Sequence, residues 1–147
     1  MVKARRFEDL QCWQKGRELA NAVHDLTGRT QFGKDWHLRN QMEDAGGSVR
    51  HNIAEGQDAG SDAEFGRFLR IARRSASEVQ SELYLALDRN YITEADLQKT
   101  YALADEVKRL INGLIAYLRK GASAGAQVRE QEALYITEDL EPGQQAA

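Results

Sequence analysis

The sequence predicts an all-α protein folded as an up-down four-helix bundle. Apolar residues recur at alternating steps of three and four over four long segments, which is the spacing of one helix face. The only proline, Pro142, lies near the C-terminus, so the first 120 residues lack the strongest helix breaker. With 147 residues, 41% of them hydrophobic and 29% charged, the chain has the length of one domain with a real core.

The first helix is expected to run from Phe7 or Glu8 to Thr27, because Glu8 and Asp9 suit the positive end of a helix dipole. Trp13 falls on a face beside the core stripe, where it either closes the edge of the core or enters a subunit contact. The core stripe itself consists of Cys12, Gly16, Leu19, Val23 and Leu26.

A loop over residues 28–35, anchored by Phe32, is expected before the second helix. That helix is predicted from a stripe at steps of four and three, made of Leu38, Met42, Ala45, Val49 and Ile53. We expect it to end near Glu55, because Gly56 takes a left-handed conformation at little steric cost.

The corner after this helix is predicted to be a tight reversal. Ser61, followed three residues later by Glu64, has the form of a capping box and indicates a new helix start. Asn52 and Glu55, near the end of the preceding helix, are suited to bonding the loop backbone. The alternative is that both side chains face solvent.

The third helix is expected from Asp62 to Asp88. Its core stripe has the spacing of bundle packing and consists of Phe65, Leu69, Ala72, Ala76, Val79, Leu83 and Ala86. Four arginines gather on the opposite face, namely Arg67, Arg70, Arg73 and Arg74. Ile71 and Leu85 also fall away from the core, and apolar side chains there indicate a second buried surface, as an oligomer provides.

The fourth helix is predicted to begin after a left-handed cap at Asn90, with Thr93 and Asp96 at its start, and to run to about Arg119. Its apolar arc is unusually broad, which favours packing against more than two neighbours. Past Gly121 the composition changes to Ala, Gly, Gln and Glu. We therefore expect a bundle over residues 1–120 and a flexible acidic tail over residues 121–147.

Three short motifs carry a family resemblance: Phe7-Glu8-Asp9-Leu10-x-x-Trp13-Gln14, Ser48-Val49-x-x-Asn52-Ile53-Ala54-Glu55-Gly56 and Glu64-x-x-x-Phe68-Leu69-x-x-Ala72. With them, residues 5–120 resemble the four-helix-bundle family of S23 or 23S rRNA intervening-sequence proteins. The chain departs from the family at Gly33, where proline is frequent, and at Gly46-Gly47, where alanine-type residues are usual. Both departures are expected to loosen the second helix.

The resemblance implies a compact bundle that assembles as a ring-shaped homopentamer. A related branch, the accessory variability proteins of diversity-generating retroelements, partners a reverse transcriptase and binds nucleic acid. The chain is therefore expected to be either a non-enzymatic oligomeric scaffold of the intervening-sequence type or a nucleic-acid-binding accessory protein that partners a reverse transcriptase. Neighbouring genes would distinguish the two.

The charge distribution bears on a nucleic-acid partner. Residues 1–120 carry 19 Lys and Arg against 18 Asp and Glu, whereas residues 121–147 carry one Arg against five acidic residues. A nearly neutral bundle is unusual for a nucleic-acid binder, although a basic stripe repeated around a ring adds up to a useful field. The alternative is that the arginines are a solvated face paired with Glu64 and Glu78.

The sequence offers no catalytic or cofactor motif. The three histidines, His24, His37 and His51, have no metal-ligand spacing to one another or to Cys12, which sits in a core stripe. We expect no enzyme activity, no metal and no cofactor. One cysteine excludes an internal disulfide, and the absence of a long apolar run or signal peptide leads us to expect a cytoplasmic protein.

Overall fold

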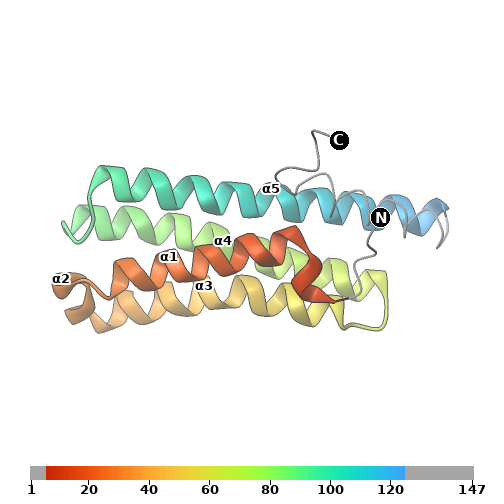
Figure 1. Ribbon diagram of the computed structural model, residues 1–147, viewed down its shortest axis with the longest axis horizontal. Helices are drawn as coiled ribbons and strands as arrows, with labels where there is room; N and C mark the ends of the chain where they lie inside the picture. Colours follow the sequence, from red (N-terminus) through yellow and green to blue (C-terminus); the bar gives the residue numbers. More distant parts are fainter. Residues whose placement is uncertain (1–5, 125–147) are drawn as a thin grey trace.

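The computed structural model describes residues 6–124, and within that range it consists of one 3-10 turn and five α-helices. These are η1 Phe7–Asp9, α1 Gln11–Thr27, α2 Thr30–Lys34, α3 Trp36–Gln57, α4 Asp62–Asp88 and α5 Glu94–Ala124. The four long helices lie side by side, and short α2 sits at one end of them (Figure 1). The predicted all-helical fold is confirmed.

The four long helices are arranged as a square. α1 packs beside α3 and α5, and α4 packs beside α3 and α5, so that α1 and α4 occupy opposite corners. The predicted stripes of α1 and α3 are buried throughout, and so is that of α4 except for half-buried Phe65. The core is therefore completed within one chain by the residues that the periodicity selects.

The corner between α3 and α4 differs from the prediction at Gly56. Instead of taking a left-handed cap, this glycine lies inside α3, which continues to Gln57 and ends on Asp58 with φ −84°. A Cβ on Gly56 would lie 2.8 Å from Phe65 Cδ1 and 2.9 Å from Phe68 Cβ. The position needs glycine because α4 packs closely against it, and the left-handed expectation is wrong.

The polar residues of this corner follow the prediction in part. Asn52 donates through Nδ2 to the carbonyl oxygen of Ser48 at 2.8 Å and to its hydroxyl at 2.9 Å, within its own helix, while Glu55 is exposed. Ser61 accepts a hydrogen bond from the Glu64 backbone N–H at 3.2 Å, which is the predicted cap. The Glu64 carboxylate turns instead to Arg67, at 3.2 Å.

The corner between α4 and α5 follows the prediction. Asn90 has φ 62°, and the backbone N–H of Tyr91 donates to the carbonyl of Ala86 at 2.9 Å, which closes the helix end. Thr93 and Asp96 bond each other's backbone N–H groups. A hydrogen bond from Arg29, which reaches across the bundle end, and one from the Thr93 backbone hold the pKa of Asp96 well below its usual range.

Three boundaries differ from the predicted ones. A separate turn, η1, precedes α1, because Leu10 is extended (φ −80°, ψ 128°) and buried. The expected loop over residues 28–35 contains α2, whose Phe32 is fully buried and stacks on Tyr91 at 5.2 Å between ring centroids. α5 continues through Gly121 to Ala124, and the predicted tail beyond it lies outside the described residues.

Candidate interaction surface on helix α4

The outward side of α4 carries side chains that the core does not use. Ile71, Glu78 and Leu85 lie two turns apart in one line, with Ile71 half-buried and Leu85 39% exposed. Tyr84, beside Leu85, is 51% exposed and meets Tyr101 of α5 edge-on at 6.1 Å. We define the α4 outer face as Arg67, Arg70, Ile71, Arg74, Glu78 and Leu85.

Two of the four predicted basic residues are engaged within the chain. Arg67 pairs with Glu64 at 3.2 Å, and its guanidinium lies 4.6 Å from the centre of the Phe68 ring. Arg73 donates to Asn112 Oδ1 of α5 at 2.7 Å and is half-buried. Both therefore have a structural role that is independent of any ligand.

The other two basic residues are free to meet a partner. Arg70 and Arg74 are exposed, and neither has an ion-pair partner among residues 6–124; the expected pairing with Glu78 is not formed. Arg70 folds toward its own helix, since a Cβ on Gly66 would lie 3.3 Å from its Nη1 atom. These two arginines have the same exposed, unpaired chemistry, which suits a phosphate or a carboxylate.

Glu82 lies at the edge of this face in an unusual environment. Its Oε2 atom is buried and has no hydrogen-bond partner within the described part of the chain. Burial, reinforced by the neighbouring Glu78 carboxylate, raises the pKa of Glu82 to about 7. The side chain therefore exchanges its charge near neutral pH.

A polar network on the adjoining side fixes how α4 meets α5. Buried Gln80 donates to Asp105 Oδ1 at 2.8 Å and to the Tyr101 carbonyl at 3.3 Å, and it accepts from Lys108 Nζ at 3.0 Å. A network with every member bonded allows one register only. The α4 outer face is thus presented on a fixed element.

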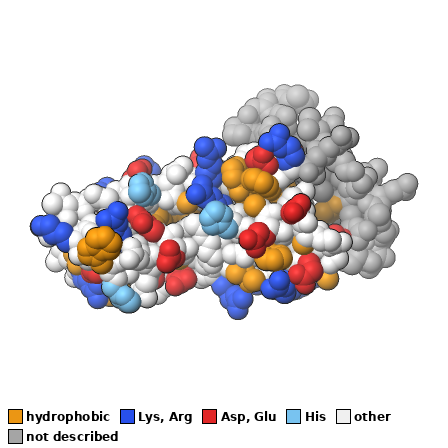
Figure 2. Space-filling view, turned by 90° about the horizontal axis from the view of Figure 1, so that it is seen from below, with side chains coloured by type: hydrophobic (Ala, Val, Ile, Leu, Met, Phe, Trp, Pro, Cys, Tyr) orange, Lys and Arg blue, Asp and Glu red, His pale blue; other side chains and the backbone are white. Residues whose placement is uncertain are grey.

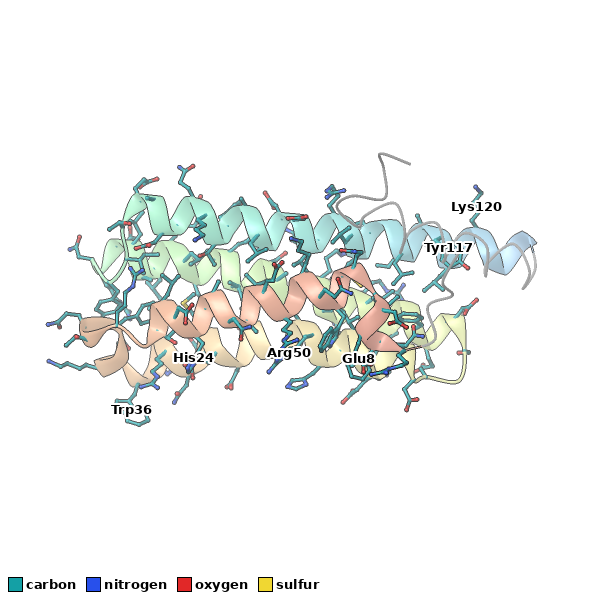
Figure 3. The ribbon with its side chains drawn as sticks, in the orientation of Figure 1. Glu8, His24, Trp36, Arg50, Tyr117 and Lys120 are labelled. Carbon is teal, nitrogen blue, oxygen red and sulfur yellow. The ribbon has the colours of Figure 1, made fainter. Side chains whose placement is uncertain are left out.

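The two tryptophans have different surroundings. Trp13 packs against the core, and its ring centroid lies 5.0 Å from that of Phe7. This is the first of its two predicted roles, closing the edge of the core. Trp36, which the sequence analysis did not single out, is 69% exposed and points away from the bundle near α2, with Arg39 5.9 Å from its ring centre (Figure 3). The sequence does indicate this exposure, because Trp36 stands two residues before the core residue Leu38 and therefore about 200° around the helix from it.

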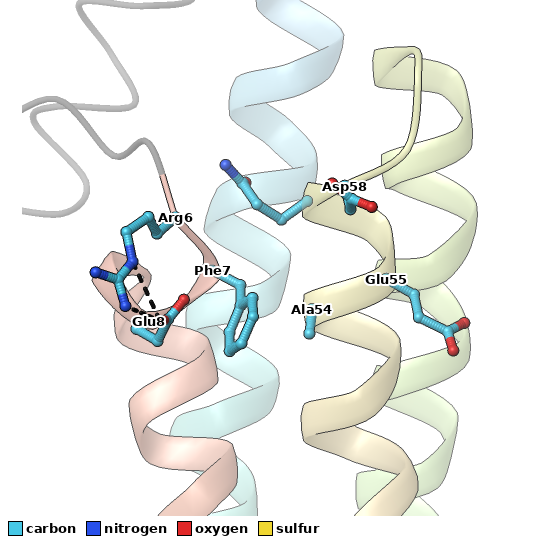
Figure 4. A pocket seen from close by; sticks show the side chains of 7 residues that line it. Arg6, Phe7, Glu8, Ala54, Glu55 and Asp58 are labelled. Atoms are coloured by element: carbon cyan, nitrogen blue, oxygen red, sulfur yellow. Dashed lines mark hydrogen bonds and ion pairs between the residues drawn. The ribbon is translucent and has the colours of Figure 1, made fainter.

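The exposed side of α3 holds two hollows on successive turns. One of about 510 Å³ is lined by Glu43, Asp44, Gly47, Ser48, Arg50, His51 and Asn52. The other, of about 500 Å³, lies between α3 and the η1 segment, where Phe7 faces Ala54 (Figure 4). Figure 2 shows this side of the molecule, on which acidic, basic, histidine and hydrophobic side chains are interspersed.

Other chemistry has little support in residues 6–124. Burial raises the pKa of the Cys12 thiol to about 12, which suits an inert core residue. Within that range no group of three or more His, Cys, Asp and Glu side chains is placed to hold a metal ion. None of the described helices is long and apolar enough to cross a membrane.

Comparison with known proteins agrees with this architecture. A family model described as 23S rRNA-intervening sequence protein matches residues 8–113. Among solved structures, the chain is similar to a protein of unknown function from the S23 ribosomal protein family of Bacteroides thetaiotaomicron. The identity is 26% over 71% of this chain and 97% of that chain, with a TM-score of 0.66. No curated protein matches.

Proposed function

The chain belongs to the family of 23S rRNA-intervening sequence proteins, and on this premise we propose that it is a non-enzymatic cytoplasmic scaffold that assembles with further copies of itself. One observation carries the proposal: the core is complete within one chain, yet Trp36, Tyr84 and Leu85 remain 69%, 51% and 39% exposed. Large apolar side chains outside a finished core are typical of a contact surface. Five subunits are expected from the family resemblance.

Sedimentation of the full-length chain at increasing micromolar concentrations tests the scaffold. We expect a single species several times heavier than the 16.5 kDa chain. A sedimentation coefficient of one chain over the whole range would contradict the proposal.

A second candidate function is that of a nucleic-acid-binding accessory protein that partners a reverse transcriptase. Exposed Arg70 and Arg74 favour it, because neither has an ion-pair partner within residues 6–124 and such guanidinium groups are available to phosphates. Binding would be independent of sequence. Its logarithmic affinity would fall with the logarithm of salt concentration by about 0.9 per phosphate neutralised on duplex DNA.

Titration of full-length protein with duplex and single-stranded DNA and RNA at low salt tests this candidate. Arg70→Glu combined with Arg74→Glu should abolish binding, and removal of residues 125–147 should strengthen it, because those residues are acidic. An Arg109→Glu variant on α5, also exposed, is the control for general loss of positive charge. If neither the full-length nor the shortened protein binds, the scaffold is the only one of the two candidate functions that remains.

A further inference from the structure

We propose that the α4 outer face of one subunit docks along the exposed side of α3 in a second copy, and that this head-to-tail contact joins the subunits of the ring that the family resemblance implies. The inference rests on the proposed scaffold function, because it names the two surfaces through which the scaffold assembles. We define the α3 docking face as Trp36, Asp44, Gly47, His51, Ala54, Glu55 and Asp58. Each of its members is exposed or half-buried.

The shape of the α3 docking face suits a helix. Its two hollows follow one another along α3, from Glu43 to Asp58, and leave room for protruding side chains. Gly47 lies in the first hollow, where a Cβ would meet only His51 Cδ2, at 3.9 Å. A glycine inside a helix is less favourable than an alanine. Packing within the subunit does not require it, so close approach from outside is its remaining use.

The charges of the two faces are complementary. Asp44, Glu55 and Asp58 on the α3 docking face have no ion-pair partner within residues 6–124. The first half of the α4 outer face carries the unpaired Arg70 and the exposed Arg67. An acidic face meeting a basic one favours this pairing over contacts between two copies of the same face.

The positions of residues along the bundle axis bring apolar side chains of the α4 outer face next to apolar side chains of the α3 docking face. The hydroxyls of Ser48 and Ser75 are 2.9 Å apart, and Arg89 meets Asp35 at 2.7 Å, which sets α3 and α4 in register. All subunits of a ring about an axis parallel to the bundle stand at one height. At about 1.5 Å per residue, Leu85 then lies within about 5 Å of the height of Trp36 in the next copy.

The same register places the rest of the contact. Ile71 comes to the height of the hollow between Gly47 and Ala54, where an aliphatic side chain has room. Arg67 and Arg70 come within a turn of Glu55 and Asp58. Arg70, which has no ion-pair partner within residues 6–124, and Arg67, whose pair with Glu64 is exposed, therefore meet the carboxylates of Glu55 and Asp58.

The placement of the two faces also closes the ring. α3 and α4 are neighbouring corners of the square, so their outward directions differ by about 90°, and the two contact directions of a subunit in a ring of four or five differ by about 90° or about 108°. Two levels oppose closure: Glu78 comes next to Asp44 of the neighbour, and Arg74 comes next to Arg50, which lines the same hollow. Glu78→Gln should therefore tighten the ring.

Charge exchange tests the inference. In full-length protein, Arg67→Glu with Arg70→Glu makes both faces acidic, and Glu55→Arg with Asp58→Arg makes both basic. Each pair alone should raise the dissociation constant of the oligomer at least tenfold, since like charges then face each other. Mixing the two variants should restore assembly, and so should the four changes combined in one chain. Circular dichroism establishes that each variant is folded, and Arg109→Glu is the control.

The outcomes separate this inference from the proposed function. A wild-type chain that is monomeric in light scattering overturns both. A wild-type oligomer whose mass is unchanged by either charge-reversed pair overturns the α3–α4 contact and leaves the scaffold standing. The contact is also overturned if both double variants fail to assemble and neither their mixture nor the fourfold variant assembles. Opposite charges face each other again in those two cases, so the proposed contact should form.

Discussion

The inner and outer faces of α4 are built from the same helix with different consequences. On the inner face every apolar position from Leu69 to Ala86 in the predicted stripe is fully buried, and the polar exceptions, Ser75 and Gln80, are hydrogen-bonded to α3 and α5. On the outer face Leu85 is exposed, and Arg74 has no ion-pair partner in the described part of the chain. The inner face accounts for the fold of one chain, and the outer face is the surface that we propose for assembly.

The sharpest test of this comparison is a matched pair of leucines two residues apart. Leu83→Ala, on the inner face, should lower the free energy of unfolding by about 2–5 kcal/mol, because it leaves a cavity in a packed core. Leu85→Ala should change the stability of the isolated subunit by less than about 0.5 kcal/mol. Urea denaturation at two protein concentrations separates them.

If the wild type assembles as proposed, its urea midpoint should rise with protein concentration. Leu85→Ala should flatten that rise, whereas Leu83→Ala should lower the midpoint at both concentrations. Equal losses for the two variants would mean that both leucines belong to the core.

The next largest effect concerns the close approach of α4 to Gly56. Gly56→Ala should destabilise by about 1–3 kcal/mol, because the new methyl group would overlap Phe65 and Phe68. Gly113→Ala on α5, where a Cβ would meet nothing within 4 Å, should stabilise by up to about 1 kcal/mol. Thermal melts of both variants check this, and a Gly56→Ala protein as stable as the wild type would refute the steric role.

At the far end of α4, Asn90→Ala should cost about 1 kcal/mol, because alanine disfavours φ 62°. Asn90→Gly, which accepts this conformation, is the matched variant and should be neutral to slightly stabilising. Chemical denaturation compares the two. Equal losses would show that the asparagine side chain, and not its backbone angle, holds the corner.

The smallest effect is a pH dependence at the boundary between the two faces. Burial raises the pKa of Glu82 to about 7 from an unfolded value of 4.5, so between these values the folded state holds more protons than the unfolded one. Stability should therefore fall as pH rises from about 4.5 to 7. Melting temperatures of wild type and Glu82→Gln over this range check it, and the variant should show the shallower decline.

Much of the fold could be predicted because periodicity reports burial directly. The stripes of α1, α3 and α4, the Ser61 cap and left-handed Asn90 all follow from local chemistry. Gly56 could not be placed, because a glycine before a polar loop looks the same whether it serves a turn or a close helix contact. Only the position of α4 in space distinguishes them.

The candidate surface was predictable in part for the same reason. A helical wheel places Ile71, Leu85 and the four arginines away from the core, but it does not show that Arg73 meets Asn112 or that Arg67 lies over Phe68. Those contacts come from another helix and from rotamer choice. The α3 hollows likewise depend on α3 side chains and on the η1 segment, which the sequence pattern does not position.

The most direct test of the central claim, that the outer face of α4 exists for assembly, is the mass of two proteins by light scattering at the same micromolar concentration. Wild type should scatter as a closed oligomer, with five subunits expected. Leu85→Arg, which should leave the core untouched, is expected to scatter as a single chain with an unchanged helical circular dichroism spectrum. A wild-type mass of one chain, or an oligomer that Leu85→Arg leaves intact, would contradict the claim.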